Sequence, residues 1–268
     1  MGFILEQLLT RITEKQDRLA KARPLPDESL RSLRDDFLIR YAHETTALEG
    51  NTLSLAETQV VLENGVTIGG KLLREHLEVI NARDAMLWLE DFVSSREPIR
   101  EDTIQRLHEI IMQGILGEDA GTYRRQPVRM VGSAHIPPNW VKIPDAMENF
   151  IRWLDQGARE EHPIVFAAKA HVSLVEIHPF VDGNGRVSRM LVNLLLMRAG
   201  YPPALYSSTE RAQYLESLER AHTEGTIEDF VRITAQAVET MLDEYLEILD
   251  MTLEGDKPPD KGAKRGLH

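Results

Sequence analysis

The chain has 268 residues, a formal net charge of -12 and no cysteine, and these properties exclude several classes of protein. An acidic surface lacks the positive field that broad binding to nucleic acid or anionic lipid requires. Without cysteine there is no disulfide, no thiolate nucleophile and no cysteine-ligated metal site. The N-terminus lacks the pattern of a signal peptide, and no run of 18 apolar residues predicts a membrane span. We therefore expect a cytoplasmic protein with no nucleic-acid or membrane partner.

Helical periodicity dominates the chain. Apolar residues recur at helical spacing in the N-terminal segment MGFILEQLLTRITEKQDRL and over residues 29–48, 72–93, 101–113, 144–154, 163–177, 186–200, 209–222 and 227–249. A shorter helix is expected after Ser54, which forms a capping box with Glu57, and Gly65 is a typical C-terminal stop. The segment from Glu254 onwards lacks apolar content and is predicted to be disordered.

The segment GTYRRQPVRMVGSAHIPPNWVKIP has a different character. It contains two short runs with strand-like composition, at residues 128–131 and 141–143, and between them lie Gly132 and two adjacent prolines. This pattern predicts a hairpin or flap. The fold class is therefore expected to be mainly α, with one small β-hairpin.

The stretch HPFVDGNGRVSR, at residues 178–189, carries more chemistry than a folding core requires. A glycine-containing loop leads into a helix start, where free N–H groups and the helix dipole favour phosphate. Arg186 and Arg189, three residues apart, add positive charge from one face. Asp182 would repel phosphate unless a hard cation such as Mg²⁺ lies between them. His178 is the only group of the stretch that accepts a proton near neutral pH, and it is a candidate general base.

The same stretch matches the signature of the Fic family, His-x-Phe-x-Asp/Glu-Gly-Asn-Gly-Arg-x-x-Arg. The resemblance implies a helical Fic catalytic core at residues 95–250, preceded by an N-terminal helical extension at 1–94 and followed by a tail at 251–268. It also implies that GTYRRQPVRMVGSAHIPP is the family's β-hairpin flap. A target protein would dock there by strand-like pairing, at about residues 128–136.

The resemblance further implies a protein adenylyltransferase, which transfers AMP from ATP to a Ser, Thr or Tyr hydroxyl of a target protein. His178 would be the general base, Asp182 the Mg²⁺ ligand and Phe180 a buried anchor beneath the loop. The phosphates of ATP would be held by Gly183, Asn184, Gly185, Arg186 and Arg189, with Arg189 at the γ-phosphate. Kinases of the wider family usually have lysine in place of Gly185, so its presence favours transfer of AMP over phosphate.

A second motif, TTALEGN at residues 45–51, is typical by itself of a helix end with a solvated glutamate. It also resembles the family's inhibitory helix motif, Ser/Thr-x-x-x-Glu-Gly/Asn, through Thr45, Glu49 and Gly50. The resemblance implies that Glu49 pairs with Arg189 and prevents productive binding of the γ-phosphate. Some members with this glutamate also remove AMP, so the sequence leaves open a catalytic role for Glu49 in the reverse direction.

Other interpretations remain open at this point. A metallohydrolase could use His162, His171, His178 and Asp182, although spacings of nine and seven residues span two or more helical turns. A non-enzymatic nucleotide-binding protein could use the flap to dock a partner. His222 is a candidate for the adenine pocket, but relatives often have asparagine near this position. The target protein and the existence of a homodimer cannot be read from the sequence.

Overall fold

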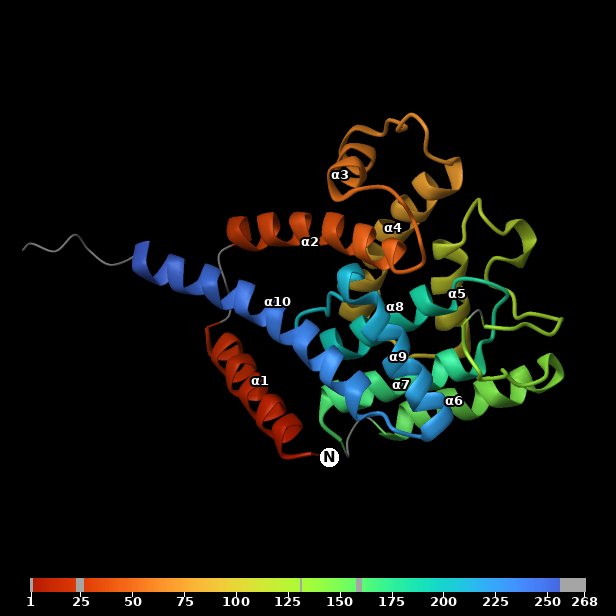
Figure 1. Ribbon diagram of the computed structural model, residues 1–268. Coiled ribbons are helices and arrows are strands. Elements are labelled where there is room, and N and C mark those ends of the chain that lie inside the picture. The colour runs from red at the N-terminus through yellow and green to blue at the C-terminus, as the bar shows by residue number, and fades with distance from the viewer. Residues whose placement is uncertain (1, 23–26, 131, 158–160, 256–268) are drawn as a thin grey trace, which may run out of the picture.

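The computed structural model describes residues 2–22, 27–130, 132–157 and 161–255, which form helices joined by loops (Figure 1). The α-helices are α1 (Phe3–Lys21), α2 (Asp27–Ala47), α3 (Leu55–Asn64), α4 (Leu73–Ser95), α5 (Glu101–Ile111), α6 (Ile143–Gly157), α7 (Pro163–Ile177), α8 (Asn184–Arg198), α9 (Arg211–Glu224) and α10 (Glu228–Gly255). Short 3-10 helices lie at Gly117–Asp119, Trp140–Lys142 and Ser208–Glu210.

Local capping signals fix several helix ends where the sequence predicts them. The capping box of Ser54 and Glu57 begins α3, and Gly65 ends it in the left-handed conformation, at φ 66°. Pro163 opens α7, in the first turn, where its missing N–H has no helical partner to lose. At the C-terminus, α10 continues to Gly255, beyond the predicted end at residue 249. The rest of the predicted tail, residues 256–268, lies outside the described residues.

The predicted β-hairpin is wrong, because no strand occurs in the part of the chain that the structure describes. The second strand-like run instead enters the 3-10 helix Trp140–Lys142, where the side-chain oxygen of Asn139 accepts a hydrogen bond from the N–H of Val141. Two-stranded hairpins are marginally stable alone, and proline cannot donate to a ladder. Strand-like composition therefore gives an irregular flap here.

The centre of the fold is the pair α7 and α8, whose apolar side chains contribute to two adjoining core clusters. One cluster joins this pair to α1, α9 and α10, and the other joins it to α2, α4, α5 and α6. Figure 1 shows α1 and α10 side by side, so the first and last helices pack together. The loop between α7 and α8 is thus held on both sides by well-packed helices.

Among the described residues, no helix combines the length and the apolar character needed to cross a membrane.

Candidate active site

His178 ends α7 and begins the loop that contains most of the predicted site. Its backbone is left-handed, with φ 49°, and its N–H donates to the carbonyl of Leu174. The ring Nδ1 lies 3.3 Å from the carbonyl oxygen of Val175, which can only accept, so Nδ1 carries the proton. Burial lowers the pKa of His178 to about 4. The imidazole is therefore neutral at pH 7, with Nε2 able to accept a proton.

Asn184 closes the loop with its side chain. The amide oxygen accepts from the N–H of Phe180 at 2.9 Å, and the amide nitrogen donates to the carbonyl of Phe180 at 2.9 Å. Phe180 is fully buried, as predicted, and its ring stacks on His108 with centroids 3.7 Å apart. The Asn184 amide is thus committed to the loop, which leaves its backbone N–H, at the start of α8, for a ligand.

Two glycines, Gly183 and Gly185, allow other groups to lie close to the backbone at the start of α8. Gly183 has φ 80°, and a Cβ added there would lie 2.8 Å from Sδ of Met112. A Cβ added at Gly185 would lie 2.5 Å from Oε1 of Glu49. The Glu49 carboxylate therefore lies against the helix start, where an anion is favoured.

Arg189 is buried, with 1% of its surface exposed, and every nitrogen of its guanidinium donates a hydrogen bond. Nε bonds Oγ1 of Thr45 at 2.8 Å, and Nη2 bonds the Thr45 carbonyl at 2.8 Å and Glu49 Oε1 at 2.7 Å. Nη1 bonds the hydroxyl of Tyr214 at 3.2 Å. Four hydrogen bonds, to Thr45 of α2, to Glu49 just after it and to Tyr214 of α9, therefore hold Arg189.

The pairing of Glu49 with Arg189 that the sequence predicts is present as an ion pair. The Glu49 side chain remains 39% exposed, so it lies at the mouth of the site. Burial acts to raise the pKa of Glu49, but the charges of Arg189 and Arg186 outweigh it and lower the pKa below its usual range. Glu49 is therefore ionised at neutral pH.

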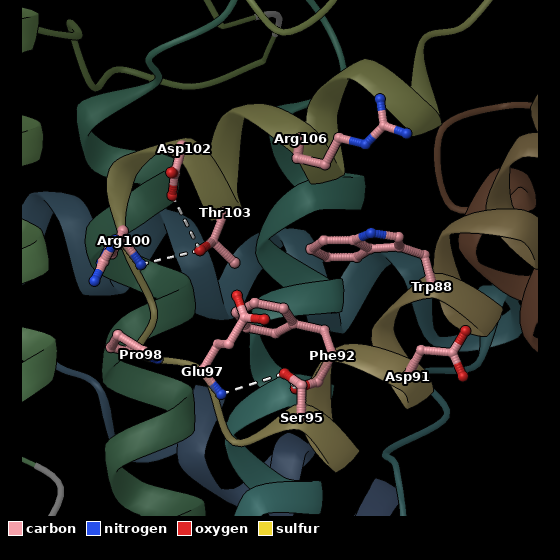
Figure 2. A pocket seen from close by; sticks show the side chains of 10 residues that line it. All are labelled: Trp88, Asp91, Phe92, Ser95, Glu97, Pro98, Arg100, Asp102, Thr103 and Arg106. Carbon is pink, nitrogen blue, oxygen red and sulfur yellow. Dashed lines mark hydrogen bonds between the residues drawn. The ribbon is translucent and has the colours of Figure 1, made fainter.

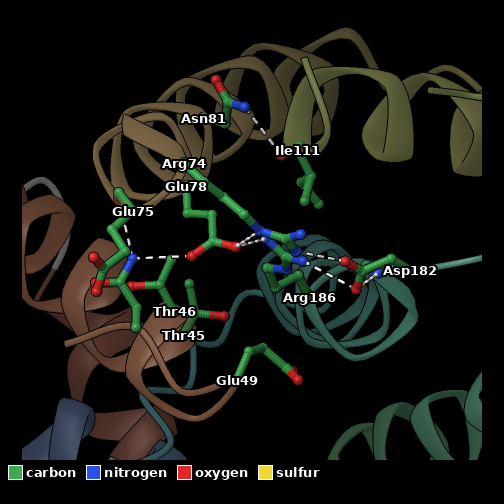
Figure 3. A network of polar contacts seen from close by, with 12 residues as sticks. Thr45, Thr46, Glu49, Arg74, Glu75, Glu78, Asn81, Ile111, Asp182 and Arg186 are labelled. Carbon is green, nitrogen blue, oxygen red and sulfur yellow. Dashed lines mark hydrogen bonds and ion pairs between the residues drawn. The ribbon is translucent and has the colours of Figure 1, made fainter. Parts of the chain in front are cut away.

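Arg186 extends towards Glu78 of α4 and also lies beside Asp182 of the loop (Figure 3). Its guanidinium is 3% exposed and lies 3.3 Å from Oδ1 of Asp182 and 3.4 Å from Oε1 of Glu78. Arg74 makes a second ion pair with Asp182, at 2.6 Å. Among the described residues, Nε of Arg186 has no hydrogen-bond partner and Nη1 has only the ion pair with Glu78, which leaves a buried donor for an anionic ligand.

Asp182 fits the role of a Mg²⁺ ligand, since its side chain is 39% exposed. Burial acts to raise its pKa, but Arg186, Arg74 and the N–H of Gly183 lower it below the usual range, so the carboxylate is ionised. Mg²⁺ commonly binds one carboxylate together with phosphate oxygens. The unpartnered Nε–H of Arg186 and the N–H groups of the helix start fit the phosphates.

The histidines of the alternative metal site contact different groups and do not share a ligand position. Nε2 of His162 contacts the Thr13 hydroxyl at 3.1 Å, and Nε2 of His171 contacts the Tyr214 hydroxyl at 2.7 Å. No group of three or more His, Asp or Glu side chains in the described part of the chain could hold a metal ion. The structure therefore contradicts a metallohydrolase of this kind.

His222, the candidate for the adenine pocket, is half-buried beneath the flap. Its Nε2 lies 3.2 Å from the carbonyl oxygen of Val172, and its ring lies 4.9 Å from that of His135. These contacts connect α9, α7 and the flap. They give His222 a packing role and leave the adenine pocket unassigned.

Sequence reasoning missed two buried residues that hold the loop. His108 accepts from the N–H of Gly121 at Nδ1, so its Nε2–H donates to the carbonyl of Asp182, at 2.9 Å. Burial lowers the pKa of His108 to about 4, which keeps it neutral. Arg124 donates to the carbonyl of His178. Neither residue lies in the motif, and no spacing in the sequence indicates its partner.

A separate surface pocket of about 650 Å³ lies between the end of α4 and the start of α5 (Figure 2). Trp88 and Phe92 stack in its wall with centroids 5.1 Å apart. None of the predicted site residues lines it. The candidate site is therefore the loop between α7 and α8 with its partners from α2 and α4.

Comparison with known proteins agrees with this site. Residues 98–196 match the model of the Fic/DOC family, and this region contains the loop and the start of α8. The solved structure of C. elegans Fic-1 (residues 134–508 of that protein) superposes with a TM-score of 0.85 at 31% identity, covering 93% of this chain and 74% of that one. This chain belongs to the Fic/DOC family.

Other members of the Fic/DOC family resemble the chain over a similar extent. A Fic domain containing signaling protein from Bacteroides thetaiotaomicron superposes with a TM-score of 0.84 at 25% identity, covering 91% of this chain and 97% of that one. The protein adenylyltransferase Fic of Drosophila mojavensis is 37% identical over 242 residues, which cover 90% of this chain and 47% of the relative. The chain thus spans about half the length of the Drosophila relatives that it matches.

Proposed function

We propose that the chain is a protein adenylyltransferase, which transfers AMP from ATP to a Ser, Thr or Tyr hydroxyl of a target protein and is restrained by Glu49. One arrangement carries the proposal. A neutral histidine with an available Nε2 stands at one end of a short loop, and an anion-binding helix start with two buried arginines stands at the other. The name of the Drosophila relatives supports the same activity.

The start of α8 supplies the groups that would bind ATP. Backbone N–H groups at Asn184 and Gly185 would bind the phosphates, because the first N–H groups of a helix have no partner within it. The guanidinium of Arg186 would add its buried Nε, which has no hydrogen-bond partner among the described residues. Arg189 would bind the γ-phosphate once Glu49 has moved away. Asp182 would hold Mg²⁺, which supplies positive charge to the phosphates.

His178 would act as the general base. Its Nε2 would take the proton of the target hydroxyl as that oxygen forms a bond to the α-phosphorus of ATP. The bond from the α-phosphorus to the bridging oxygen of the β-phosphate would break. The products are the AMP ester of the target and pyrophosphate. The hydrogen bond from Nδ1 to Val175 supports this role, because it fixes the tautomer that the step requires.

The target would dock at the flap, at about residues 128–136. Residues 128–130 and 132–136 of the flap form no strand ladder, so their backbone groups can pair with an extended segment of another chain. Ile136 is exposed on the same segment and would contact the target. In this proposal, the target supplies the strand that pairs with the backbone of the flap.

Glu49 would restrain the enzyme by occupying the place of a phosphate. Its carboxylate bonds Arg189 and lies 2.5 Å from the position that a Cβ at Gly185 would take, so it would exclude a phosphate both by its negative charge and by its volume. Opposite unit charges about 4 Å apart attract by about 4 kcal/mol at an effective dielectric of 20, before desolvation. Glu49 is partly exposed, so solvent reduces this value.

A second candidate is removal of AMP by the same site. The ionised, partly exposed Glu49 carboxylate could orient a water molecule towards a bound AMP ester. This activity requires Glu49, whereas AMP transfer is opposed by it. Loss of AMP from a modified protein on addition of wild-type chain, but not of Glu49→Gly, would support the second candidate.

The transferred group can be tested directly. Incubation of Glu49→Gly with Mg²⁺ and ATP labelled at the α-phosphate should label protein, whereas ATP labelled at the γ-phosphate should not. Label from the γ-phosphate alone would indicate a kinase. ATP binding without labelling from either position, with the chain itself and a protein extract as acceptors, would support a nucleotide-binding protein.

A further inference from the structure

Arg124 lies in the loop between α5 and α6 and is buried, with 3% of its surface exposed. Its guanidinium donates to three backbone carbonyls: Nε to His178 at 2.8 Å, Nη1 to Gln126 at 3.0 Å and Nη2 to Pro138 at 2.7 Å. Its backbone N–H donates to the carbonyl of Pro179 at 2.9 Å. One residue thus bonds the loop and both ends of the flap.

The surroundings of Arg124 are unusual for a buried cation. A buried guanidinium normally pairs with a carboxylate, because desolvation of a charge is costly. The partners of Arg124 are carbonyl oxygens, and burial lowers its pKa without an opposing effect from any acidic group. Charge-assisted hydrogen bonds to carbonyls are strong and directional. This pattern indicates a side chain that holds backbone in place.

The bonds of Arg124 fix the backbone around His178. A left-handed conformation is unfavourable for a non-glycine residue, and it persists only where surrounding contacts impose it. The N–H of His178 is held by Leu174, and its carbonyl is held by Arg124. The next carbonyl, that of Pro179, is also held by Arg124. The direction of the imidazole therefore depends on these bonds.

The bonds of Arg124 also close the base of the flap. Gln126 and Pro138 flank the segment that would dock the target, and the two nitrogens of one planar group bond both. In the described part of this segment no strand ladder performs that task. The guanidinium thus links the two ends of the flap, a task that cross-strand hydrogen bonds perform in a β-hairpin.

We propose that Arg124 is a positioning residue that aligns the general base His178 with the flap, so that a docked hydroxyl and Nε2 meet in the reactive geometry. The proposal rests on the proposed AMP transfer and adds to it a residue outside the signature. A misplacement of about 1 Å costs roughly 10²-fold in rate. Loss of the Arg124 guanidinium should therefore slow the transfer step more than it weakens nucleotide binding, which we assign to the start of α8.

The test compares Arg124→Gln and Arg124→Lys in the Glu49→Gly background, with Arg125→Gln as the matched control. Arg125 is the exposed neighbour of Arg124, and its substitution removes the same charge. The measured quantities are the rate of self-modification at saturating Mg²⁺ and ATP, and the Kd of a non-hydrolysable ATP analogue. Arg124→Gln should lower the rate by roughly 10²-fold and change the Kd by less than about threefold. Arg124→Lys should restore part of the rate, and Arg125→Gln should match its parent.

Equal rates for folded Arg124→Gln and Arg125→Gln would overturn the proposal. So would a parallel loss of rate and nucleotide affinity, because that outcome indicates general destabilisation. Hydrogen exchange gives a second readout that needs no activity. Arg124→Gln should exchange faster at residues 126–130, 132–138 and 178–180, with α8 unchanged. If the Glu49→Gly parent transfers no AMP, the proposed function fails, and unchanged exchange in these segments would still refute the positioning role.

Discussion

The two ends of the loop between α7 and α8 are held in different ways. At the first end, His178 and Pro179 are fixed by Arg124 and by α7, through backbone hydrogen bonds. At the second end, the start of α8 is faced by the partly exposed side chain of Glu49, which comes from the end of α2. His178 is therefore held by buried contacts, whereas the start of α8 is covered by a partly exposed side chain. In the function that we propose, this difference places control at nucleotide binding.

The largest expected effect comes from removal of the base. In the Glu49→Gly background, His178→Ala should lower the rate of AMP transfer by about 10²- to 10⁴-fold, because general base catalysis is lost. The Kd of an ATP analogue should stay within about threefold of the parent, since in the proposed function the phosphates are bound by the start of α8. The two constants are obtained from initial rates and from calorimetric titration. A parallel loss of binding would mean that the two ends of the loop are not separable.

Removal of the Glu49 side chain should affect nucleotide binding at the start of α8. Glu49→Gly should tighten the binding of an ATP analogue by roughly tenfold, which corresponds to about 1.4 kcal/mol. This figure is below the unscreened attraction because Glu49 is partly exposed. Glu49→Gln is the matched variant, since it removes the charge and keeps the volume beside Gly185. We expect intermediate affinity from it, measured by the same titration; equal Kd values for all three forms would contradict the account.

The loop itself can be weakened without a change in charge. Asn184→Ala leaves the buried N–H and carbonyl of Phe180 without partners, which costs about 1–3 kcal/mol of the free energy of unfolding. Urea denaturation of the variant and of wild type measures this difference. Asn149→Ala, on the exposed face of α6, is the control and should change stability little. A neutral result for Asn184→Ala would show that the loop is held by other contacts.

A smaller effect concerns pH. The pKa values of His178 and His108 are lowered to about 4, whereas an unfolded histidine has a pKa of about 6.5. Between these values the unfolded chain binds more protons, so the free energy of unfolding should fall as the pH decreases from about 6.5 to 4. Urea denaturation at pH 7 and pH 5 measures the difference. His178→Gln should reduce it, and an unchanged difference would argue against a buried neutral imidazole.

Local features of the sequence predicted much of this structure. The ends of α3 and α7 follow from capping residues within a few positions of them, and the start of α8 follows from the glycine loop. The pairing of Glu49 with Arg189 could be expected only through the family resemblance, because the two residues are 140 positions apart.

The remaining features depend on contacts that no short pattern encodes. Arg124 meets His178 across 54 positions, and Arg74 meets Asp182 across 108. The described residues of the two strand-like runs, 128–130 and 141–143, have no partner strand, so their composition did not decide their structure. Hydrogen bonds from Arg124 to His178, Gln126 and Pro138 hold this segment, and the sequence pattern does not indicate them.

The central claim is that a ready base and a covered anion site share one loop. The most direct test is the intact mass of wild type, Glu49→Gly and Glu49→Gly with His178→Ala after incubation with Mg²⁺ and ATP. We expect a gain of one or more AMP groups in Glu49→Gly, little gain in wild type and none in the double variant. Equal modification of wild type and Glu49→Gly, or modification of the double variant, would contradict it.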